Sequence, residues 1–440
     1  MNIFDLTLQL KGYPLQKARL TLQRLSKLDE AAFSAYAEEQ RTTILNYHLN
    51  NNNFYKEFTN NSSGFENWAD VPVMTKKDLQ QPLNNRLSKG FSPENCYVNK
   101  TSGSSGDPFI FAKDKFTHAL TWAIIQQRFG WYGIDFNSSL QARFYGILLD
   151  FWGYSTEKIK DYLSMRMRFS VFDLSDKAFE SLHKKFATEA FEYINGYTSA
   201  VVQFAKYLKQ HKLHLKTICP TLKVCVVTSE MLFDTDKELM ESVFGVPVVN
   251  EYGASELDLI AFETPAGEWK INTESLYVEV LDSNNKVLPF GEEGRIVITS
   301  LYNKAHPFIR YDIGDTGIIS ESSTAVDLIL EKLTGRTNDI AMLPSGKTAA
   351  GLTFYYITKS IIEDDGNVKE FIIEQLNPST FKITYTCEQP LEASQKAKIK
   401  TEMERYLEPG LVILFEQTKC LDRSKRGKLK QFSSQVKSIS

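Results

Sequence analysis

The chain alternates short apolar runs with segments of helical periodicity, and this alternation limits its possible folds more than any other feature. The runs 222–228 and 246–250 end at polar residues, as the strands of a buried parallel sheet do. A third run covers 141–149, and helical patterns near 176–192 and 200–211 lie between it and the other two. Strands that alternate with helices predict a mixed α/β layer fold.

The character of the sequence changes after about residue 267, where short strand-like runs are separated by Gly, Asn and Asp turns. This pattern predicts a β-rich subdomain, with strands over 276–281, 294–300 and 316–320. Because 440 residues are too many for one ordinary core, more than one domain is expected. We predict a large N-terminal domain over 1–335, with mixed parallel sheets, and a small α+β C-terminal domain over 336–440.

Two further local patterns carry expectations. Leucines and aromatic residues recur at near-helical spacing over 15–56, whereas the asparagine-rich stretch 46–61 predicts a turn region. In the C-terminal part, helical patterns near 353–363 and 392–406 alternate with strand-like runs.

Composition excludes several functional classes. The formal net charge of −3 gives no general attraction to nucleic acid or to an anionic membrane. The five cysteines form no Cys-x-x-Cys pair and the six histidines form no metal-type cluster, which argues against a zinc ribbon or redox motif. The first residues lack a basic start, and no apolar run approaches the ~20 residues of a membrane span. We expect a cytoplasmic protein.

The segment 101–108, Thr-Ser-Gly-Ser-Ser-Gly-Asp-Pro, has no apolar side chain to bury in a core. Its glycines allow backbone N–H groups to turn toward an anion, and its hydroxyls add donors, which is the chemistry of a phosphate-binding loop. A mobile Gly/Ser linker explains the same composition. The spacing is not that of a Walker loop or of a dinucleotide fingerprint, so the segment favours ATP chemistry on another fold.

Four later segments supply polar groups suited to a nucleotide. In 250–256, Tyr252 is suited to lie against a base, Ser255 near a phosphate and Glu256 on Mg²⁺, although an ordinary polar turn accounts for the same residues. The segment 310–315 predicts a turn that presents Asp315 to the hydroxyls of a ribose. The other two are a polar hinge over 334–339 and a basic loop over 423–428, and the latter also fits a solvated charge run.

Together and in this order, the five segments resemble those of the adenylate-forming superfamily of acyl-CoA synthetases and adenylation domains. The similarity runs from about residue 40 to about 430 and is greatest to the branch of phenylacetate–CoA ligases and capsular-polysaccharide-biosynthesis proteins. The resemblance implies ATP and Mg²⁺ as cofactors and CoA as the expected acceptor. It also implies that the C-terminal domain is mobile.

The resemblance assigns roles residue by residue. Lys428 and Glu256 are the expected catalytic residues, and Glu256 is the expected Mg²⁺ ligand. The expected nucleotide-binding residues are Thr101, Ser102, Gly103, Ser104, Ser105, Gly106, Tyr252, Gly253, Ser255, Asp315 and Arg336. The segments 195–198 and 228–230 match the acyl-pocket and adenine-proximal segments more loosely. The chain departs from the family at Asn338, beside the hinge, and at Asp107, where a basic residue is common.

The implied activity is an ATP-dependent ligase that joins a carboxylic acid to AMP with release of pyrophosphate, and then transfers the acyl group to CoA. Transfer to a carrier-protein thiol or to an amine, such as an amino sugar, is the alternative. A silent nucleotide-binding relative is a third possibility, but it has no physical reason to keep Glu256, Asp315, Arg336 and Lys428. The aromatic stretch Phe144, Tyr145, Phe151, Trp152 and Tyr154 fits an aryl pocket or, more commonly, a core.

Overall fold

The computed structural model describes residues 3–60, 64–101, 109–145, 161, 164–169, 171, 174–336, 340–346, 348–350, 368–387, 389–422 and 430–436. The chain divides into two compact units. The first comprises Met1–Ile313 and Ile318–Lys332, and the second comprises Gly314–Gly317 and Leu333–Ser440.

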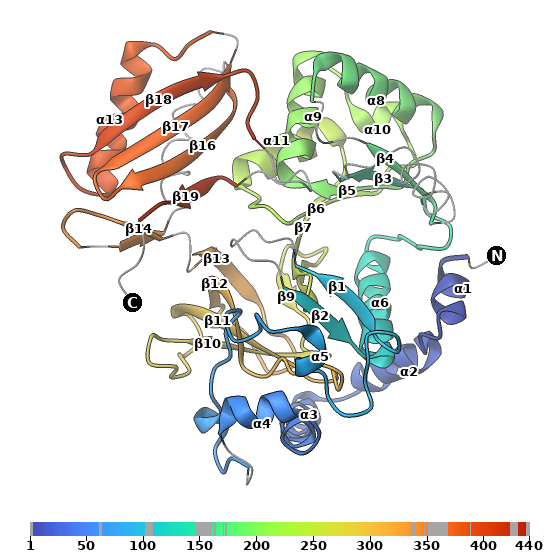
Figure 1. The fold of residues 1–440 in the computed structure, drawn as a ribbon. Helices are drawn as coiled ribbons and strands as arrows, with labels where there is room; N and C mark the ends of the chain where they lie inside the picture. Colours follow the sequence, from blue (N-terminus) through green and yellow to red (C-terminus); the bar gives the residue numbers. More distant parts are fainter. Residues whose placement is uncertain are drawn as a thin grey trace. The chain divides into compact units, whose positions relative to one another are not determined.

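A seven-stranded sheet forms the centre of the first unit (Figure 1). Five neighbouring strands are parallel and two antiparallel strands follow at one edge. In sheet order they are β4 (Arg166–Phe169), β3 (Gln141–Phe144), β5 (Tyr193–Tyr197), β6 (Val224–Thr228), β7 (Val248–Ala254), β8 (Asp258–Glu263) and β9 (Trp269–Ile271). This sheet confirms the predicted mixed α/β fold.

Helices cover both faces of the parallel strands, as such strands require. Side chains of α8 (Asp176–Thr188), α9 (Thr198–Gln210) and α11 (Asp234–Phe244) pack with one face in a single core, and α10 (Leu215–Ile218) adds Leu215. The opposite face packs with α2 (Leu15–Leu25) and α6 (Lys115–Gly130). Cys225 is fully buried in the first of these cores, as the apolar run around it predicts.

The N-terminal part is helical, but the expected asparagine-rich turn is wrong. Beyond α1 (Ile3–Leu10) and α2, helix α3 (Glu30–Asn51) continues through this stretch, and α4 (Asn53–Thr59) follows it. Leu45 and Leu49 are buried while Asn46 and Asn50 face solvent, so burial of the leucines outweighs the low helix propensity of asparagine. Only Asn52 breaks the helix, and its side chain caps α4 by accepting the Tyr55 N–H at 2.8 Å.

A four-stranded sheet follows, as the turn-rich pattern predicts. Its strands, in sheet order, are β10 (Leu276–Leu281), β11 (Glu293–Ser300), β12 (Tyr311–Ile319) and β13 (Leu330–Arg336). The segment 310–315 is therefore not a turn, because all of it except Arg310 lies in β12. Alternate residues of β12 are buried, which is the pattern of a half-covered strand and explains why polar residues are tolerated within it.

Arg310 has a structural role at the start of β12. Its side chain is fully buried, and its NH1 group donates to the carbonyl oxygens of Ala69 and Val71 at 2.9 and 2.7 Å. Its Nε lies 3.4 Å from a carboxylate oxygen of Glu279. The short segments η1 (Trp68–Asp70) and α5 (Leu83–Arg86) belong to this N-terminal region of the unit.

The second unit contains a four-stranded sheet with one described helix. Its sheet order is β18 (Val412–Thr418), β17 (Thr380–Cys387), β16 (Val368–Asn377) and β19 (Phe432–Ser434), and α13 (Ala393–Tyr406) connects β17 to β18. The pair β14 (Ile340–Met342) and β15 (Thr348–Ala350) forms a separate small ladder. The helix expected near 353–363 lies outside the described residues. Within the described ranges, no helix is both long and apolar enough to cross a bilayer.

Three buried histidines of the first unit are held in their neutral form. His48 Nε2 lies 2.9 Å from the carbonyl oxygen of Asn303, and burial lowers the pKa of His48 to about 4. Burial likewise lowers the pKa of His118 to about 4 and the pKa of His306 well below its usual range. In the unfolded chain each ring takes up a proton near its ordinary pKa of about 6.5.

The free energy of unfolding is therefore expected to fall as the pH drops below about 6.5. The unfolded state then binds protons that the folded rings exclude until the pH nears 4, so the stabilisation is complete above the unfolded pKa and is lost toward the folded one. Between pH 7 and 5.5 the loss amounts to about 1 kcal/mol per histidine in urea titrations. The His48→Gln variant should show a shallower dependence, and a constant free energy across this interval would contradict the assignment.

Candidate functional site

A tight hairpin fixes both ends of the predicted phosphate loop. Strands β1 (Tyr97–Lys100) and β2 (Ile110–Lys113) are antiparallel neighbours, and the loop joins them. Thr101 N–H donates to the carbonyl oxygen of Phe109, and Phe109 N–H donates to Thr101 Oγ1, both at 3.0 Å. Thr101 thus closes the base of the loop. The predicted residues Ser102, Gly103, Ser104, Ser105 and Gly106, with Asp107, lie outside the described residues.

Arg86 holds the strand that leaves the loop. Its side chain is almost fully buried, and its NH2 group donates to the carbonyl oxygen of Ile110 at 2.5 Å. Its NH1 group donates to His306 Nε2, and the guanidinium lies 5.7 Å from the ring centre of Phe109. Burial lowers the pKa of Arg86 to about 10. The position of β2 is therefore set by a buried cation as well as by the ladder.

The predicted aromatic–Gly–Ala–Ser–Glu segment forms the hairpin between β7 and β8. Tyr252, Gly253 and Ala254 end β7, and β8 begins at Asp258. A Cβ atom on Gly253 would lie 2.5 Å from the carbonyl oxygen of Asp258, so only glycine permits this close approach. Asp258 itself has φ +60°, a conformation in which Asp is tolerated better than most residues. The local sequence thus shapes a tight turn that displays Ser255 and Glu256.

Lys113 links the hairpin that carries the predicted phosphate loop to this turn. Lys113 is at the end of β2, only 2% exposed, and its ammonium forms an ion pair with Asp258. The same ammonium donates to the carbonyl oxygen of Ser255 at 3.2 Å. Thr121 Oγ1 donates to the same carboxylate oxygen, Asp258 Oδ2, at 2.9 Å. A buried cation therefore ties the exit of the loop to the turn that carries Glu256.

We expect Lys113→Met to lower the free energy of unfolding by about 3 kcal/mol, because it leaves a partly buried carboxylate without its cation. The double variant Lys113→Met/Asp258→Asn should recover part of this loss, since asparagine removes the charge and accepts the positive φ of residue 258. Urea unfolding of the two variants and the parent protein measures both effects. An unfolding midpoint for Lys113→Met equal to that of the parent would show that the ion pair does not stabilise the turn.

Glu256 has a defined partner. Its side chain is 8% exposed, and Tyr311 Oη donates to Glu256 Oε1 at 3.0 Å from the first residue of β12. The Tyr311 ring packs on Phe308 with ring centres 5.3 Å apart, and Phe308 in turn packs on Phe109 at 6.4 Å. A row of aromatic side chains therefore connects Phe109, which follows the predicted phosphate loop, to the carboxylate of Glu256.

This carboxylate fits a Mg²⁺ ligand. In the part of the chain that the structure describes, no group of three or more His, Cys, Asp or Glu side chains is arranged to hold a metal ion by itself. Mg²⁺ in nucleotide enzymes is commonly held by one or two carboxylates together with substrate phosphates, so a single carboxylate such as Glu256 suits it. The hydrogen bond from Tyr311 fixes one oxygen and orients the other.

The two loosely matched segments meet at the carboxyl edge of the parallel sheet. Tyr197 at the end of β5 is paired with Thr228 at the end of β6. Glu230, just beyond β6, accepts the Ser199 N–H at 2.7 Å, and Thr198 Oγ1 donates to the carbonyl oxygen of Glu230 at 3.2 Å. The edge where ligands bind to sheets of this kind is thus built by cross-linked loops.

The remaining predicted residues belong to the second unit. Asp315 is buried within β12, and Arg336 is the last residue of β13. Lys428 and Asn338 lie outside the described residues. The roles assigned to Asp315, Arg336 and Lys428 therefore remain predictions.

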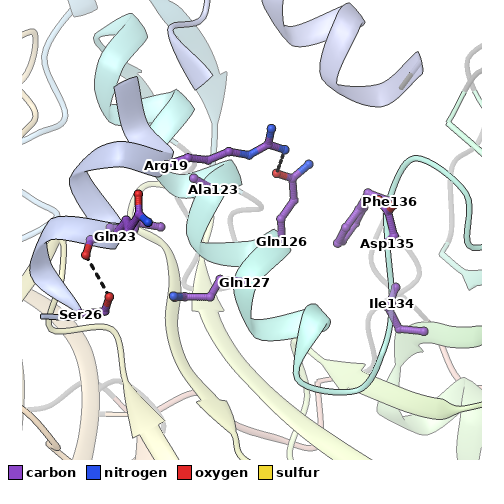
Figure 2. Close-up of a pocket in the computed structure, with 10 residues that line it drawn as sticks. Arg19, Gln23, Ser26, Ala123, Gln126, Gln127, Ile134, Asp135 and Phe136 are labelled. Carbon is purple, nitrogen blue, oxygen red and sulfur yellow. Dashed lines mark hydrogen bonds between the residues drawn. The ribbon is translucent and has the colours of Figure 1, made fainter. Parts of the chain in front are cut away.

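A cavity of about 450 Å³ lies elsewhere in the first unit (Figure 2). Residues of α2 and α6 line it together with Ile134, Asp135 and Phe136. Arg19 and Gln126 point toward one another across it, and Arg19 NH2 donates to Gln126 Oε1 at 2.8 Å. Of the predicted site residues that the structure describes, none lines this cavity.

Sequence reasoning missed Lys113, Tyr311 and Arg86. A lysine that directly follows the apolar run 109–112 was a usable signal for Lys113, because charged residues rarely end such runs without a partner. Tyr311 and Arg86 gave no signal, since each contacts a residue far away in the sequence.

Comparisons with known proteins found similar sequences and a similar fold. No family model matches the chain. The chain is 23% identical over 358 residues to protein CapK of Staphylococcus aureus, and the match covers 76% of each sequence. It is 30% identical over 128 residues to the phenylacetate-coenzyme A ligase of Aromatoleum evansii, which covers 28% of this chain and 29% of the ligase.

The fold is similar to that of 2-hydroxyisobutyryl-CoA ligase in the postadenylation state. The TM-score is 0.66 at 15% identity, over 92% of this chain and 89% of the ligase. The similarity therefore extends through both units. The chain is thus similar in sequence to protein CapK and to a phenylacetate-coenzyme A ligase, and similar in fold to 2-hydroxyisobutyryl-CoA ligase.

Proposed function

We propose that the protein activates a carboxylic acid with ATP, forming an acyl-adenylate and pyrophosphate, and then transfers the acyl group. The observation that carries the proposal is the connection between two motifs. The predicted phosphate loop ends on β2, and Lys113 and Phe109 of that hairpin lead to the turn that displays Ser255 and Glu256. A triphosphate held by the loop would therefore have a magnesium ligand built onto the same support.

The chemistry explains why such groups are needed. A carboxylate is a poor electrophile, because substitution at its carbon would expel oxide. Attack of the carboxylate oxygen on the α-phosphorus forms the carboxyl-to-phosphate bond, breaks the bond to the β-phosphate oxygen and releases pyrophosphate. Negative charge shifts over the phosphate oxygens during this step, and fixed cations and N–H donors must stabilise it.

Each predicted residue has one proposed role in binding ATP or in stabilising this charge. Hydroxyl and N–H groups of 101–106 bind the terminal phosphates, Tyr252 packs against adenine and Ser255 lies near the α-phosphate. Glu256 would hold Mg²⁺, which would neutralise charge on the phosphate oxygens when bound. Asp315 accepts the ribose hydroxyls. Lys428 bridges the carboxylate and the α-phosphate, because a compact ammonium on a flexible stem can reach both.

The proposal also includes a movement of the C-terminal domain. The segment 336–440 acts as a mobile domain that pivots after Arg336 and carries Lys428 in and out of the site. With Lys428 removed, the acceptor can reach the acyl-adenylate. CoA is the proposed acceptor, since the ligase of Aromatoleum evansii and 2-hydroxyisobutyryl-CoA ligase both form CoA esters by name. An enzyme of this kind would work in the cytoplasm, where ATP and CoA are supplied.

Pyrophosphate release in the presence of ATP, Mg²⁺ and a panel of aryl, fatty, hydroxy, dicarboxylic and amino acids tests the first step. The proposal predicts release that requires the acid, and acid-dependent loss of free CoA thiol in the same assay. Release without loss of thiol would redirect the second step to an amine or to a carrier-protein thiol. Binding of ATP without release for any acid would indicate a silent nucleotide-binding relative.

A further inference from the structure

Three arginines gather on one face of the parallel sheet. Arg143 of β3 is paired with Arg168 of β4, and Gln141 is paired with Arg166 two residues earlier. On the other side of β3, Arg143 is paired with Asn195 of β5. Paired residues of adjacent strands point to the same face, so all of these polar side chains share one surface. The adjoining part of this face, at Tyr193 and Val224, is apolar and packs with α6.

Only two of the three arginines are paired with a carboxylate in the described ranges. Asp161 Oδ1 lies 2.5 Å from Arg166 Nε and 2.9 Å from Arg168 NH2. Among the described residues, Arg143 has no hydrogen bond and no ion pair, and its Nε is buried without a partner. Its guanidinium lies over the ring of Tyr145, 4.3 Å from the ring centre. Burial and the neighbouring arginines lower the pKa of Arg143, and an arginine nevertheless stays charged near neutral pH.

The position of Arg143 points to a ligand. Strand β3 lies between β4 and β5 in the sheet, so the chain continues from β3 to β4 on one side and then to β5 and β6 on the other. Parallel sheets bind ligands at their carboxyl edge, at the place where the strand order reverses in this way. At this edge the rings of Tyr145 and Tyr197 meet, with centres 4.6 Å apart.

The same face leads to the proposed nucleotide motif. Thr228, paired with Tyr197, is also paired with Glu251, which directly precedes Tyr252. Burial raises the pKa of Glu251, while Thr228 and Arg143 oppose that rise. Arg143 therefore lies within electrostatic range of the strand that carries the adenylation motif.

We propose that Arg143 binds a second carboxylate on the acid that the enzyme activates, so that the substrate class is dicarboxylic acids. This inference rests on the proposed function, since it names the acid used in the same reaction. A half-buried guanidinium without a partner is costly, and a planar carboxylate matches its fork of N–H donors with two parallel hydrogen bonds. An acid with an uncharged acyl group would leave this cation buried beside apolar atoms.

Matched pairs of acids test the proposal by pyrophosphate release: butanedioate against butanoate, pentanedioate against pentanoate, and benzene-1,3-dicarboxylate against benzoate. We expect kcat/KM for the preferred diacid to exceed that of its monoacid partner by roughly 10²-fold, as for a desolvated charge pair. Arg143→Met should remove this preference, mainly through KM, and Arg143→Lys should keep part of it because lysine retains the charge. Arg19→Met, which replaces a more exposed arginine on α2, is the control and should keep the full preference.

Two further measurements separate the possible failures. Arg143→Met should unfold at the same temperature as the parent or higher, because the variant loses only the contact with the Tyr145 ring and no longer buries a cation without a described carboxylate partner. Calorimetric binding of the diacids without ATP should show binding to the parent protein and loss of binding in Arg143→Met. If monoacids are used as well as diacids and Arg143→Met changes nothing, the substrate assignment is overturned while acid activation stands. If no acid releases pyrophosphate but a diacid binds through Arg143, acid activation fails and the binding site stands. If diacids are neither bound nor activated, the assignment of dicarboxylic acids as substrates is overturned.

Discussion

Replacing Lys428 by alanine is expected to slow acyl-adenylate formation by ~10³-fold while leaving ATP binding within a few-fold of the parent protein. The ammonium is proposed to contact the carboxylate and the α-phosphate only as negative charge shifts between them, so its loss affects the transition state more than the bound ATP. Exchange of labelled pyrophosphate into ATP, with the acid present, measures the first step directly. Titration with ATP, followed by tryptophan fluorescence, measures binding.

Two comparisons make this result specific. Lys430→Ala removes a lysine two residues beyond Lys428 and should exchange pyrophosphate at the rate of the parent. A chemically prepared acyl-adenylate should be converted to the CoA ester by Lys428→Ala at close to the parent rate, because the lysine leaves the site for that step. Unchanged exchange in Lys428→Ala would remove this residue from the mechanism.

Replacing Glu256 by alanine is expected to lower kcat for pyrophosphate release by ~10²-fold and to raise the Mg²⁺ concentration needed for half-maximal rate. Glu256 is the buried carboxylate that the turn between β7 and β8 displays, and it would be the protein's own ligand to the ion. Tyr311→Phe, which removes the hydroxyl that orients Glu256 Oε1, should give a smaller effect in the same direction, on the order of 10-fold.

The matched control is Glu268→Ala, which replaces an exposed glutamate in the turn between β8 and β9. Its rate and its dependence on Mg²⁺ should equal those of the parent protein. A Glu256→Ala variant with lower kcat but an unchanged Mg²⁺ requirement would assign Glu256 to the shape of the turn rather than to the metal. Rescue of Tyr311→Phe by added Mg²⁺ would support the positioning role of the tyrosine.

The strand predictions show which elements of the fold can be predicted from the spacing of apolar residues. The runs 222–228 and 246–250 became β6 and β7, because a strand buried on both faces has to be apolar throughout and leaves a clear pattern. The prediction for 46–61 failed because local asparagine content does not show that Leu45 and Leu49 pack in a core. The prediction of a turn at 310–315 failed for a related reason, since polar residues are tolerated on the less buried positions of β12.

In the candidate site, too, some features could be predicted from the sequence and others required the structure. The sequence alone predicted Thr101, Tyr252, Ser255 and Glu256 as nucleotide-binding residues, because binding a nucleotide requires particular residue types at short spacing along the chain. Their roles remain predictions. The sequence also predicted the α/β fold, because apolar periodicity is a local property. Only the tertiary structure revealed that Lys113 supports the turn at Asp258, 145 residues later, that Tyr311 orients Glu256, and that Arg143 lies on one face with two further arginines. These contacts join segments that folding brings together across the sheet, and no local pattern records which distant side chain will neutralise or orient a given charge.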